Sequence, residues 1–462
     1  MRLPRVFSFF GIIAFASACS EQPVPVEPPV ASAAGGAGLQ GAPLPAVVVV
    51  TGAVHACALG VDRRTYCWGG NTLGQLGDGS NMSSTRPVPV AGGLHFVQLT
   101  SGGWDHTCGL TDEGEAYCWG WNAFGQLGDG SMTSSNVPVR AAANLTFTNL
   151  DAGTYHTCGV TPAGAAYCWG ANGPLNGAFS DVPSSAGFAL GAPTTASCTN
   201  PATVAGGAPY RGSPWPCSPA PLAVSGGVSF RSISAGLWAT CGVAVSGVAY
   251  CWGLNFGYQL GNNALAGATT PTPVAGGWLF DEVVLGALHG CGLVNHDGYC
   301  WGGRLFNWGS LGTGSFLGSS TPAPVVGGLS FAGVIPSDAN DIYTFTCGLT
   351  TEGAAYCWGA NRQGALGTEV ALPSCADNVA MFPCSNVPVP VAGGLKFISL
   401  AAGREFACGV SRSRATYCWG ANDFGQLGDG TTTDRFTPVL VQSPGRRRGA
   451  LAPAQALADV IP

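Results

Sequence analysis

Residues Gly103–Gly130 read GWDHTCGLTDEGEAYCWGWNAFGQLGDG, and this stretch recurs along most of the chain. Its first half has two short alternating runs, around Cys108 and around Cys118, joined by Asp112-Glu113-Gly114. A three-residue connection ending in glycine is typical of a β-hairpin, because its last position takes a positive φ. The second half, Gly125–Gly130, is too rich in glycine for a strand. We predict a hairpin followed by a compact loop.

The hairpin also predicts which residues face each other. Counting outward from the connection gives three pairs: Thr111 with Glu115, Leu110 with Ala116, and Cys108 with Cys118. The two sulfur atoms of the last pair then lie across from each other. A disulfide is expected there, although sequence alone does not fix the connectivity of so many cysteines.

The cysteine pair of this unit occurs seven times, and each second cysteine opens a Cys-Trp-Gly triplet whose tryptophan we expect to pack between sheets. The seven expected disulfides join Cys57 with Cys67, Cys108 with Cys118, Cys158 with Cys168, Cys241 with Cys251, Cys291 with Cys300, Cys347 with Cys357 and Cys408 with Cys418. Two further pairs lie inside insertions, Cys198 with Cys217 and Cys375 with Cys384. Of the 19 cysteines, these nine pairs leave Cys19 alone.

A second recurrent piece, Pro87–Phe96 (PVPVAGGLHF), separates the units and predicts two more short strands around a Gly-Gly turn. Seven units of about four strands, without helical periodicity, predict an all-β, seven-bladed propeller with four antiparallel strands per blade. The first segment, Ala46–Val50, and the last, Pro438–Val441, each match half of a unit. We therefore expect the N- and C-terminal segments to pair, to build one blade jointly and to close the ring.

The full pattern, G-x-x-H-T-C-x-L-T-x-x-G-x-x-Y-C-W-G-x-N-x-x-G-Q-L-G-D-G, resembles the repeat of the regulator of chromosome condensation family. The resemblance covers residues 46–441 and implies a seven-bladed propeller. It departs from the pattern at Gly173–Asn176 and at Ile342, where altered loops are expected. It also implies a guanine nucleotide exchange activity. We give that activity the lowest rank, because an exported protein would not meet the GTPase.

The N-terminus predicts export. Residues 1–18 combine Arg2 and Arg5 with a short apolar run, the form of a signal peptide. Ala16–Cys19 resembles the bacterial lipobox, which predicts lipidation of Cys19 and explains the unpaired cysteine. Cleavage by an ordinary signal peptidase after Ala18 is the alternative. The other 18 cysteines would then lie where disulfides persist, in the periplasm or outside the cell.

Composition divides the rest of the chain. Residues 19–45 are rich in Pro, Ala and Gly and are interpreted as a lipid-anchored flexible linker. Residues 46–441 form the propeller, and residues 442–462 are a predicted disordered tail. The tail carries Arg446-Arg447-Arg448, which are either solvated or in contact with an anionic surface. We expect a monomer that touches the membrane through its lipid alone.

Other chemistries have weaker support. A net charge of −6 with 9% charged residues argues against nucleic-acid binding. Four histidines share one repeat position, but Ala239, Phe345 and Phe406 replace them elsewhere, which favours packing over metal binding. The four are His55, His106, His156 and His289. The glycine-rich loops lack a lysine for phosphate. We assign no catalytic residue, cofactor or metal ligand, but two carboxylates could still meet in space.

Two insertions, residues 173–219 and 365–386, each contain their own cysteine pair. The first carries Phe188, Tyr210, Arg211 and Trp215, residue types that anchor protein interfaces. The hypothesis is a non-enzymatic protein-interaction module, displayed on the cell envelope as a lipoprotein, that binds an unknown protein or envelope macromolecule through loops on one propeller face. Two alternatives stay open: tolerated surface insertions without a binding role, and a secreted enzyme acting on glycan or cell wall.

Overall fold

The computed structural model describes residues 42–173, 189–194, 196–198, 215–304, 307–338, 343–376 and 381–444. The predicted signal peptide, Cys19, most of the linker and the arginines of the tail lie outside these residues. The described residues form seven antiparallel sheets arranged as the blades of a propeller. Five blades have four strands that follow one another in the chain from the innermost strand outward. The third and sixth blades have a fifth, short strand at the outer edge, which precedes its neighbouring strand in the chain.

The strands of the seven blades have the following bounds. Blade 1 contains β1 (Ala46–Thr51), β2 (His55–Gly60), β3 (Thr65–Gly69) and β4 (Ser84–Pro89), and blade 2 contains β5 (Gln98–Ser101), β6 (His106–Leu110), β7 (Ala116–Gly120) and β8 (Ser135–Arg140). Blade 3 contains β9 (Asn149–Ala152), β10 (His156–Val160), β11 (Ala166–Ala171), β12 (Ser197–Cys198) and β13 (Trp215–Ala223). Blade 4 contains β14 (Phe230–Ala235), β15 (Ala239–Ala244), β16 (Ala249–Gly253) and β17 (Ala268–Pro273).

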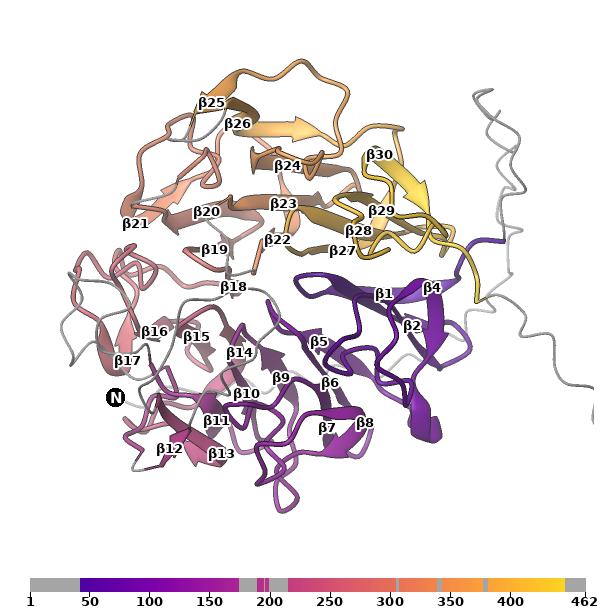
Figure 1. Ribbon diagram of the computed structural model, residues 1–462. Coiled ribbons are helices and arrows are strands. Elements are labelled where there is room, and N and C mark those ends of the chain that lie inside the picture. The colour runs from indigo at the N-terminus through magenta and orange to yellow at the C-terminus, as the bar shows by residue number, and fades with distance from the viewer. Residues whose placement is uncertain are drawn as a thin grey trace, which may run out of the picture. The chain divides into compact units, whose positions relative to one another are not determined.

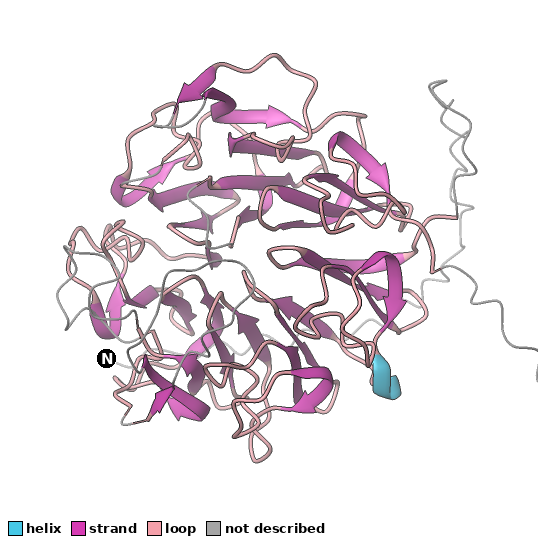
Figure 2. Ribbon diagram, in the orientation of Figure 1, coloured by secondary structure: helices cyan, strands magenta, loops and turns pink. Residues whose placement is uncertain are grey.

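The remaining blades follow the same order. Blade 5 contains β18 (Glu282–Leu285), β19 (His289–Val294), β20 (Asp297–Gly302) and β21 (Ser319–Pro324). Blade 6 contains β22 (Phe331–Pro336), β23 (Phe345–Thr350), β24 (Ala355–Ala360), β25 (Ser374–Ala376) and β26 (Met381–Pro390). Blade 7 contains β27 (Phe397–Ala402), β28 (Phe406–Ser411), β29 (Thr416–Gly420) and β30 (Arg435–Leu440). A single 3₁₀ turn, η1 (Ala91–Gly93), is the only helical element in the part of the chain that is described (Figure 2).

The blades form a closed ring (Figure 1). Each innermost strand contacts the innermost strand of the next blade, and β27 of blade 7 contacts β1 of blade 1. The terminal segments pair as predicted, because Pro43 bridges Gln442 and the backbone N–H of Leu44 donates to the carbonyl of Val441 at 2.9 Å. The pairing leaves the first and last blades side by side.

The prediction of a jointly built blade is wrong. Ala46–Thr51 pairs with β2 along its length, so it is the inner strand of blade 1. Blade 7 has its own inner strand, β27, paired with β28. Each repeat therefore already contains a complete blade from inside to outside. The two chain ends meet beside the sheets rather than within one of them.

The hairpin register was predicted correctly. Leu110 pairs with Ala116 and Cys108 with Cys118, and Gly114 has φ 80°. The Cα atoms of Cys108 and Cys118 are 4.1 Å apart. That short separation is typical of the non-hydrogen-bonded pairs of an antiparallel ladder, whose side chains lie close enough to bond.

The nine disulfides join the nine predicted pairs of cysteines. Seven of them cross the hairpins between second and third strands: Cys57 with Cys67, Cys108 with Cys118, Cys158 with Cys168, Cys241 with Cys251, Cys291 with Cys300, Cys347 with Cys357 and Cys408 with Cys418. The other two lie in the insertions of blades 3 and 6, where they join Cys198 with Cys217 and Cys375 with Cys384. Every blade therefore has at least one covalent cross-link of its own.

The Cys-Trp-Gly tryptophans connect neighbouring blades. All seven are fully buried, and each indole Nε1 donates to a backbone carbonyl in the glycine-rich loop of the preceding blade. Trp119 donates to Gln75 at 3.0 Å, and Trp68 of blade 1 donates to Gln426 of blade 7 at 2.9 Å. The last bond completes a ring of seven. Burying an aromatic ring of this size at each blade junction is a large stabilising term.

Candidate functional site

The two ends of the strands define two faces of the propeller. The hairpin turns between second and third strands lie with the connections between blades, as shown by the bond from Arg412 N to Lys396 O at 2.8 Å. We call this end the turn face. The long loops between third and fourth strands lie at the other end with the connections from first to second strands, as the bond from Trp121 N to Asp105 O shows. We call this end the loop face.

A channel of about 330 Å³ runs between the inner strands, and all seven blades contribute to its wall. Three carboxylates line it, those of Asp151, Glu282 and Asp338, whereas no described lining residue is a lysine or arginine. None of the three was among the predicted site residues. They come from blades 3, 5 and 6 and have no shared motif.

Asp151 has a structural role. Its carboxylate accepts the hydroxyl of Thr100 at 2.7 Å from blade 2 and the backbone N–H of Ala235 at 2.8 Å from blade 4. Burial raises the pKa of Asp151, and these donors act against the shift. An inner strand has an unpaired edge, so a side chain that satisfies the backbone of the next blade stabilises the ring.

Asp338 comes from the connection that follows β22 in blade 6 and reaches blade 3. The hydroxyl of Thr154 donates to its carboxylate at 3.2 Å. Burial, and then the nearby Asp151 carboxylate, raise the pKa of Asp338 well above its usual range. Because Thr154 lies in the connection between β9 and β10, Asp338 crosses the loop-face end of the channel.

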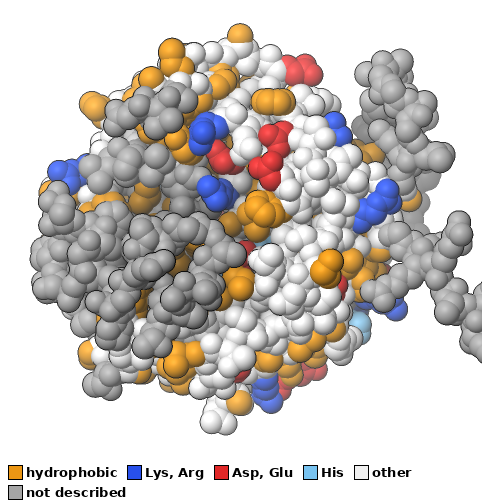
Figure 3. Space-filling view, in the orientation of Figure 1, with side chains coloured by type: hydrophobic (Ala, Val, Ile, Leu, Met, Phe, Trp, Pro, Cys, Tyr) orange, Lys and Arg blue, Asp and Glu red, His pale blue; other side chains and the backbone are white. Residues whose placement is uncertain are grey.

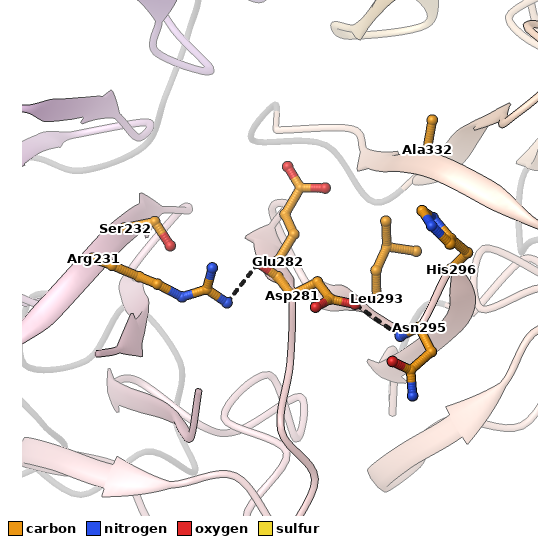
Figure 4. Close-up of a pocket in the computed structure, with 8 residues that line it drawn as sticks. All are labelled: Arg231, Ser232, Asp281, Glu282, Leu293, Asn295, His296 and Ala332. Carbon is orange, nitrogen blue, oxygen red and sulfur yellow. Dashed lines mark hydrogen bonds between the residues drawn. The ribbon is translucent and has the colours of Figure 1, made fainter. Parts of the chain in front are cut away.

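A bowl of about 820 Å³ lies on the turn face of blades 4, 5 and 6 and shares Glu282 with the channel lining. Its wall is formed by Arg231, Ser232, Asp281, Glu282, Leu293, Asn295, His296 and Ala332 (Figure 4). The Arg231 guanidinium is held by the carbonyls of Phe280 at 2.7 Å and Asp281 at 2.9 Å. The Asp281 carboxylate accepts the backbone N–H of Asn295 at 2.8 Å. Most charged groups of the bowl are thus used within the protein.

Glu282 is the exception and belongs to both the bowl and the channel. Figure 4 shows its carboxylate pointing away from the Asp281 carboxylate and from the Arg231 guanidinium. Burial raises its pKa. A carboxylate in this position can accept a donor from a ligand, but Asp151 and Asp338, the other channel carboxylates, are already bonded to the protein.

The loop face contains a cluster of aromatic side chains from blades 2, 3 and 4. Tyr155 and Trp238 stack with ring centres 4.4 Å apart, and Phe124 and Trp215 stack at 4.7 Å. Trp215 is 1% exposed. Trp215, one of the four residues of the predicted interaction loop, is therefore packed within this cluster, because the adjacent blades supply aromatic surfaces that bury it. Phe188, Tyr210 and Arg211 lie outside the described residues.

The long loops of the loop face present apolar side chains to solvent in each blade whose loop is fully or largely described. Leu317 is 79% exposed and Met82 is 76% exposed. The set comprises Met82, Met132, Leu265, Phe316, Leu317, Val370 and Phe424. Figure 3 shows both apolar and charged side chains scattered over the face in view. Exposed apolar groups of this size are available for contacts with another molecule.

The four repeat-related histidines are packed between blades. All four are fully buried, and burial lowers the pKa of each to about 3. Each Nε2 atom lies within 3.0 Å of a threonine hydroxyl in the next blade. No group of three potential metal ligands occurs among the residues with described positions.

No helix in the described part of the chain is long and apolar enough to cross a membrane.

Two models of the regulator of chromosome condensation (RCC1) repeat match this chain. One covers residues 63–110, 113–160, 352–410 and 415–452, and the other covers residues 96–126 and 397–426. The chain is therefore a seven-bladed propeller that carries regulator of chromosome condensation repeats.

Similar proteins extend over most of the chain. The ultraviolet-B receptor UVR8 of Arabidopsis thaliana is 24% identical over 408 residues, which are 87% of this chain and 82% of the receptor. The structure of Prp20p from Saccharomyces cerevisiae, studied for its binding to Gsp1p and histones, has a TM-score of 0.65 at 18% identity and covers 86% of this chain and 88% of that one. Yeast RCC1 (Prp20) bound to Kap60 has a TM-score of 0.65 at 17% identity and covers 92% of each chain. These structures establish the fold.

Proposed function

We propose that this protein is a non-enzymatic binding module, anchored to the cell envelope through a lipid on Cys19, that binds a protein or envelope macromolecule with its loop face. The observation that carries the proposal is the repeated exposure of large apolar side chains on the long loops, such as Met82 and Leu317. Groups of this kind, held on a rigid scaffold, lose little freedom on binding.

The disulfides support both rigidity and export. Nine of them cross-link the chain, and such bonds persist in oxidising compartments rather than in the cytosol. Propellers of similar fold bind protein partners, since the yeast protein has been crystallised with Kap60. By analogy, a protein partner is the first to be sought here.

Co-purification from detergent-solubilised membranes tests the binding proposal. The wild-type chain and a double variant, Met82→Ser with Leu317→Ser, are isolated with their partners, which mass spectrometry quantifies. A turn-face variant, Val245→Ser with Leu279→Ser, is the matched control, because those two side chains are 68% and 59% exposed. We expect the loop-face variant to lose at least tenfold of its specific partner, since interface truncations that matter cost more than about 1.4 kcal/mol. Equal recovery with all three proteins would refute binding through these loops.

Lipidation is tested separately. Growth with an alkyne-bearing fatty acid should label the wild-type protein but not Cys19→Ser, and only the wild type should partition into detergent. Labelling of neither protein would remove the anchor from the proposal and favour ordinary cleavage after Ala18. The loop-face experiment would keep its meaning, because it can be repeated with the secreted protein.

A secreted enzyme acting on glycan or cell wall is the second candidate, because the channel brings three carboxylates with raised pKa values together. Such groups are needed for general acid–base hydrolysis. Against this candidate, Asp151 and Asp338 are held by hydrogen bonds within the protein. Release of soluble fragments from purified cell wall by the wild type, and not by Glu282→Gln, would favour the enzyme.

A further inference from the structure

Five of the cationic side chains of the turn face lie in blades 1 and 7, which adjoin in the ring. We call these residues the terminal basic patch: Arg63, Arg64, Lys396, Arg412 and Arg414. All five are exposed, and none makes an ion pair with a described residue. In contrast, Arg231 of the bowl donates to the carbonyls of Phe280 and Asp281, and Arg140 pairs with Glu115 at 2.7 Å.

The patch surrounds the point at which the N-terminal segment enters the propeller. The backbone N–H of Ala46 donates to the carbonyl of Arg414 at 2.9 Å, and that of Val61 donates to the carbonyl of Pro45 at 3.2 Å. The entering chain therefore runs between the basic turn of blade 7 and that of blade 1. The C-terminal segment leaves at the same place, because Ser443 N bonds to Ala42 O at 2.7 Å.

Backbone conformation shows that two of the arginines occupy demanding positions. Arg63 and Arg414 end their turns with φ values of 64° and 69°. The equivalent residue is glycine in blades 2, 3, 4 and 6, namely Gly114, Gly164, Gly247 and Gly353. A side chain disfavours this conformation, which glycine adopts freely. The two blades beside the chain ends thus place a cation where four of the other five blades have glycine.

Few negative charges oppose the patch. Asp62 lies within it and is used locally, since it accepts the Tyr66 hydroxyl at 2.7 Å and the Arg64 backbone N–H at 3.1 Å. Glu352 lies at its edge, where its backbone carbonyl accepts the Arg412 guanidinium at 2.8 Å. Asp112 of blade 2 is close enough to Arg63 for the cation to lower its pKa, after larger effects from nearby hydrogen bonds. The patch keeps an excess of positive charge.

We propose that the terminal basic patch docks the turn face onto the anionic lipid headgroups of the membrane that holds the anchor. This inference rests on the proposed lipid on Cys19 for its location, because the linker from residue 19 joins the propeller in the middle of the patch. Each lysine or arginine near an anionic surface strengthens binding about fivefold, within a Debye length of the headgroups. A tether also raises the local concentration of the surface. Docking of the turn face directs the loop face, and its apolar side chains, away from the membrane.

Vesicle co-sedimentation tests the patch without relying on the anchor. The full chain carrying Cys19→Ser is mixed with phosphatidylcholine vesicles, with or without phosphatidylglycerol. Arg63→Gly with Arg414→Gly is the test variant, because four other blades fold with glycine at this position. Arg86→Gln with Arg304→Gln is the control, with the same loss of charge at exposed sites outside the turn face. The tail arginines are present in every protein, so their contribution to vesicle binding cancels in the comparison.

We expect the parent protein and the control to bind the anionic vesicles alike, and the test variant to bind roughly 25-fold more weakly, two factors of about five. Added salt should weaken the binding of the parent protein. Equal binding by the test variant and the control, or equal binding to neutral vesicles, would overturn the proposal. Retention on an immobilised acidic protein without vesicle binding would also overturn it and indicate a protein partner. If the protein binds the vesicles but Cys19 carries no lipid in the cell, the docking proposal is supported and the lipid-anchor proposal is refuted.

Discussion

The Nε2 atom of His55 in blade 1 lies 2.9 Å from the Oγ1 atom of Thr107 in blade 2. The same pair links three more neighbouring blades, through His106 with Thr157, His156 with Thr240 and His289 with Thr346. The hydroxyl of Thr157 donates to the carbonyl of Gln126 at 2.9 Å. Because the hydroxyl proton of Thr157 is used in this bond, His106 must donate to Thr157 from Nε2. The Nδ1 atom of His106 is then unprotonated.

The repeats themselves show that the two positions depend on each other. Where the histidine is replaced by Ala239, Phe345 or Phe406, the next blade has no threonine at the partner position. The residues found there are Gly290, Ala407 and Ala56. A buried imidazole without a partner is costly, and so is a buried hydroxyl facing a phenyl ring. The pairs are thus alternative solutions to one packing problem, polar in four junctions and apolar in three.

This arrangement predicts loss of stability in acid. Burial lowers the pKa of His55 to about 3 from 6.5, so the unfolded chain takes up a proton that the folded chain rejects. The free energy of unfolding should fall as pH drops through that window, by about 1.4 kcal/mol per pH unit for each such histidine. Chemical denaturation at several pH values measures the slope. His55→Phe with Thr107→Ala, which copies an apolar junction, should have a shallower slope. An unchanged slope would mean that His55 is protonated in the folded protein.

Local features of this protein could be predicted from its sequence, whereas features that depend on contacts between blades could not. The pairing of Cys108 with Cys118 follows from one short turn. Asp151 and Glu282 lie on inner strands, and an alignment of the repeats could have placed both beside the axis. Asp338 lies outside the repeat pattern and meets Thr154 across the ring. The burial of Trp215 could not be predicted, because it depends on aromatic groups from three blades.

Asp105 predicts a pH effect of the opposite sign. Burial raises the pKa of Asp105 to about 6, against a donor bond from Gln75 Nε2. The unfolded chain therefore releases its proton first, and this residue's contribution to stability is lost as pH rises from 3.8 to about 6. Asp105→Asn keeps an acceptor for Gln75 and removes the charge. Above pH 6 it should raise the free energy of unfolding by up to about 3 kcal/mol. Urea titration at neutral and acid pH checks this, since the gain should shrink in acid.

The hairpin disulfides should account for a large part of the stability. Cys108 and Cys118 close a loop with a sequence separation of 10. Loops of this size contribute about 2–3 kcal/mol by restricting the unfolded chain. Replacing both residues by alanine should lower the free energy of unfolding by that amount under oxidising conditions and have little effect on the reduced protein. A loss of equal size in the reduced protein would assign the effect to packing instead.

Gly77 tests the packing of the tryptophan junctions. Its φ is 65°, and a Cβ atom there would lie 2.7 Å from the indole ring of Trp119. Gly93 is a matched control, because its φ is 64° and a Cβ atom would meet nothing within 4 Å. Gly93→Ala should cost about 1 kcal/mol through backbone conformation alone. Gly77→Ala should cost roughly 3 kcal/mol or more, because the indole must move and its bond to Gln75 weakens. The difference between the two variants, measured by denaturant unfolding with tryptophan fluorescence, isolates the packing at the junction. Equal losses would show that the blades separate easily enough to admit a methyl group, and the tryptophans would then not hold the ring together.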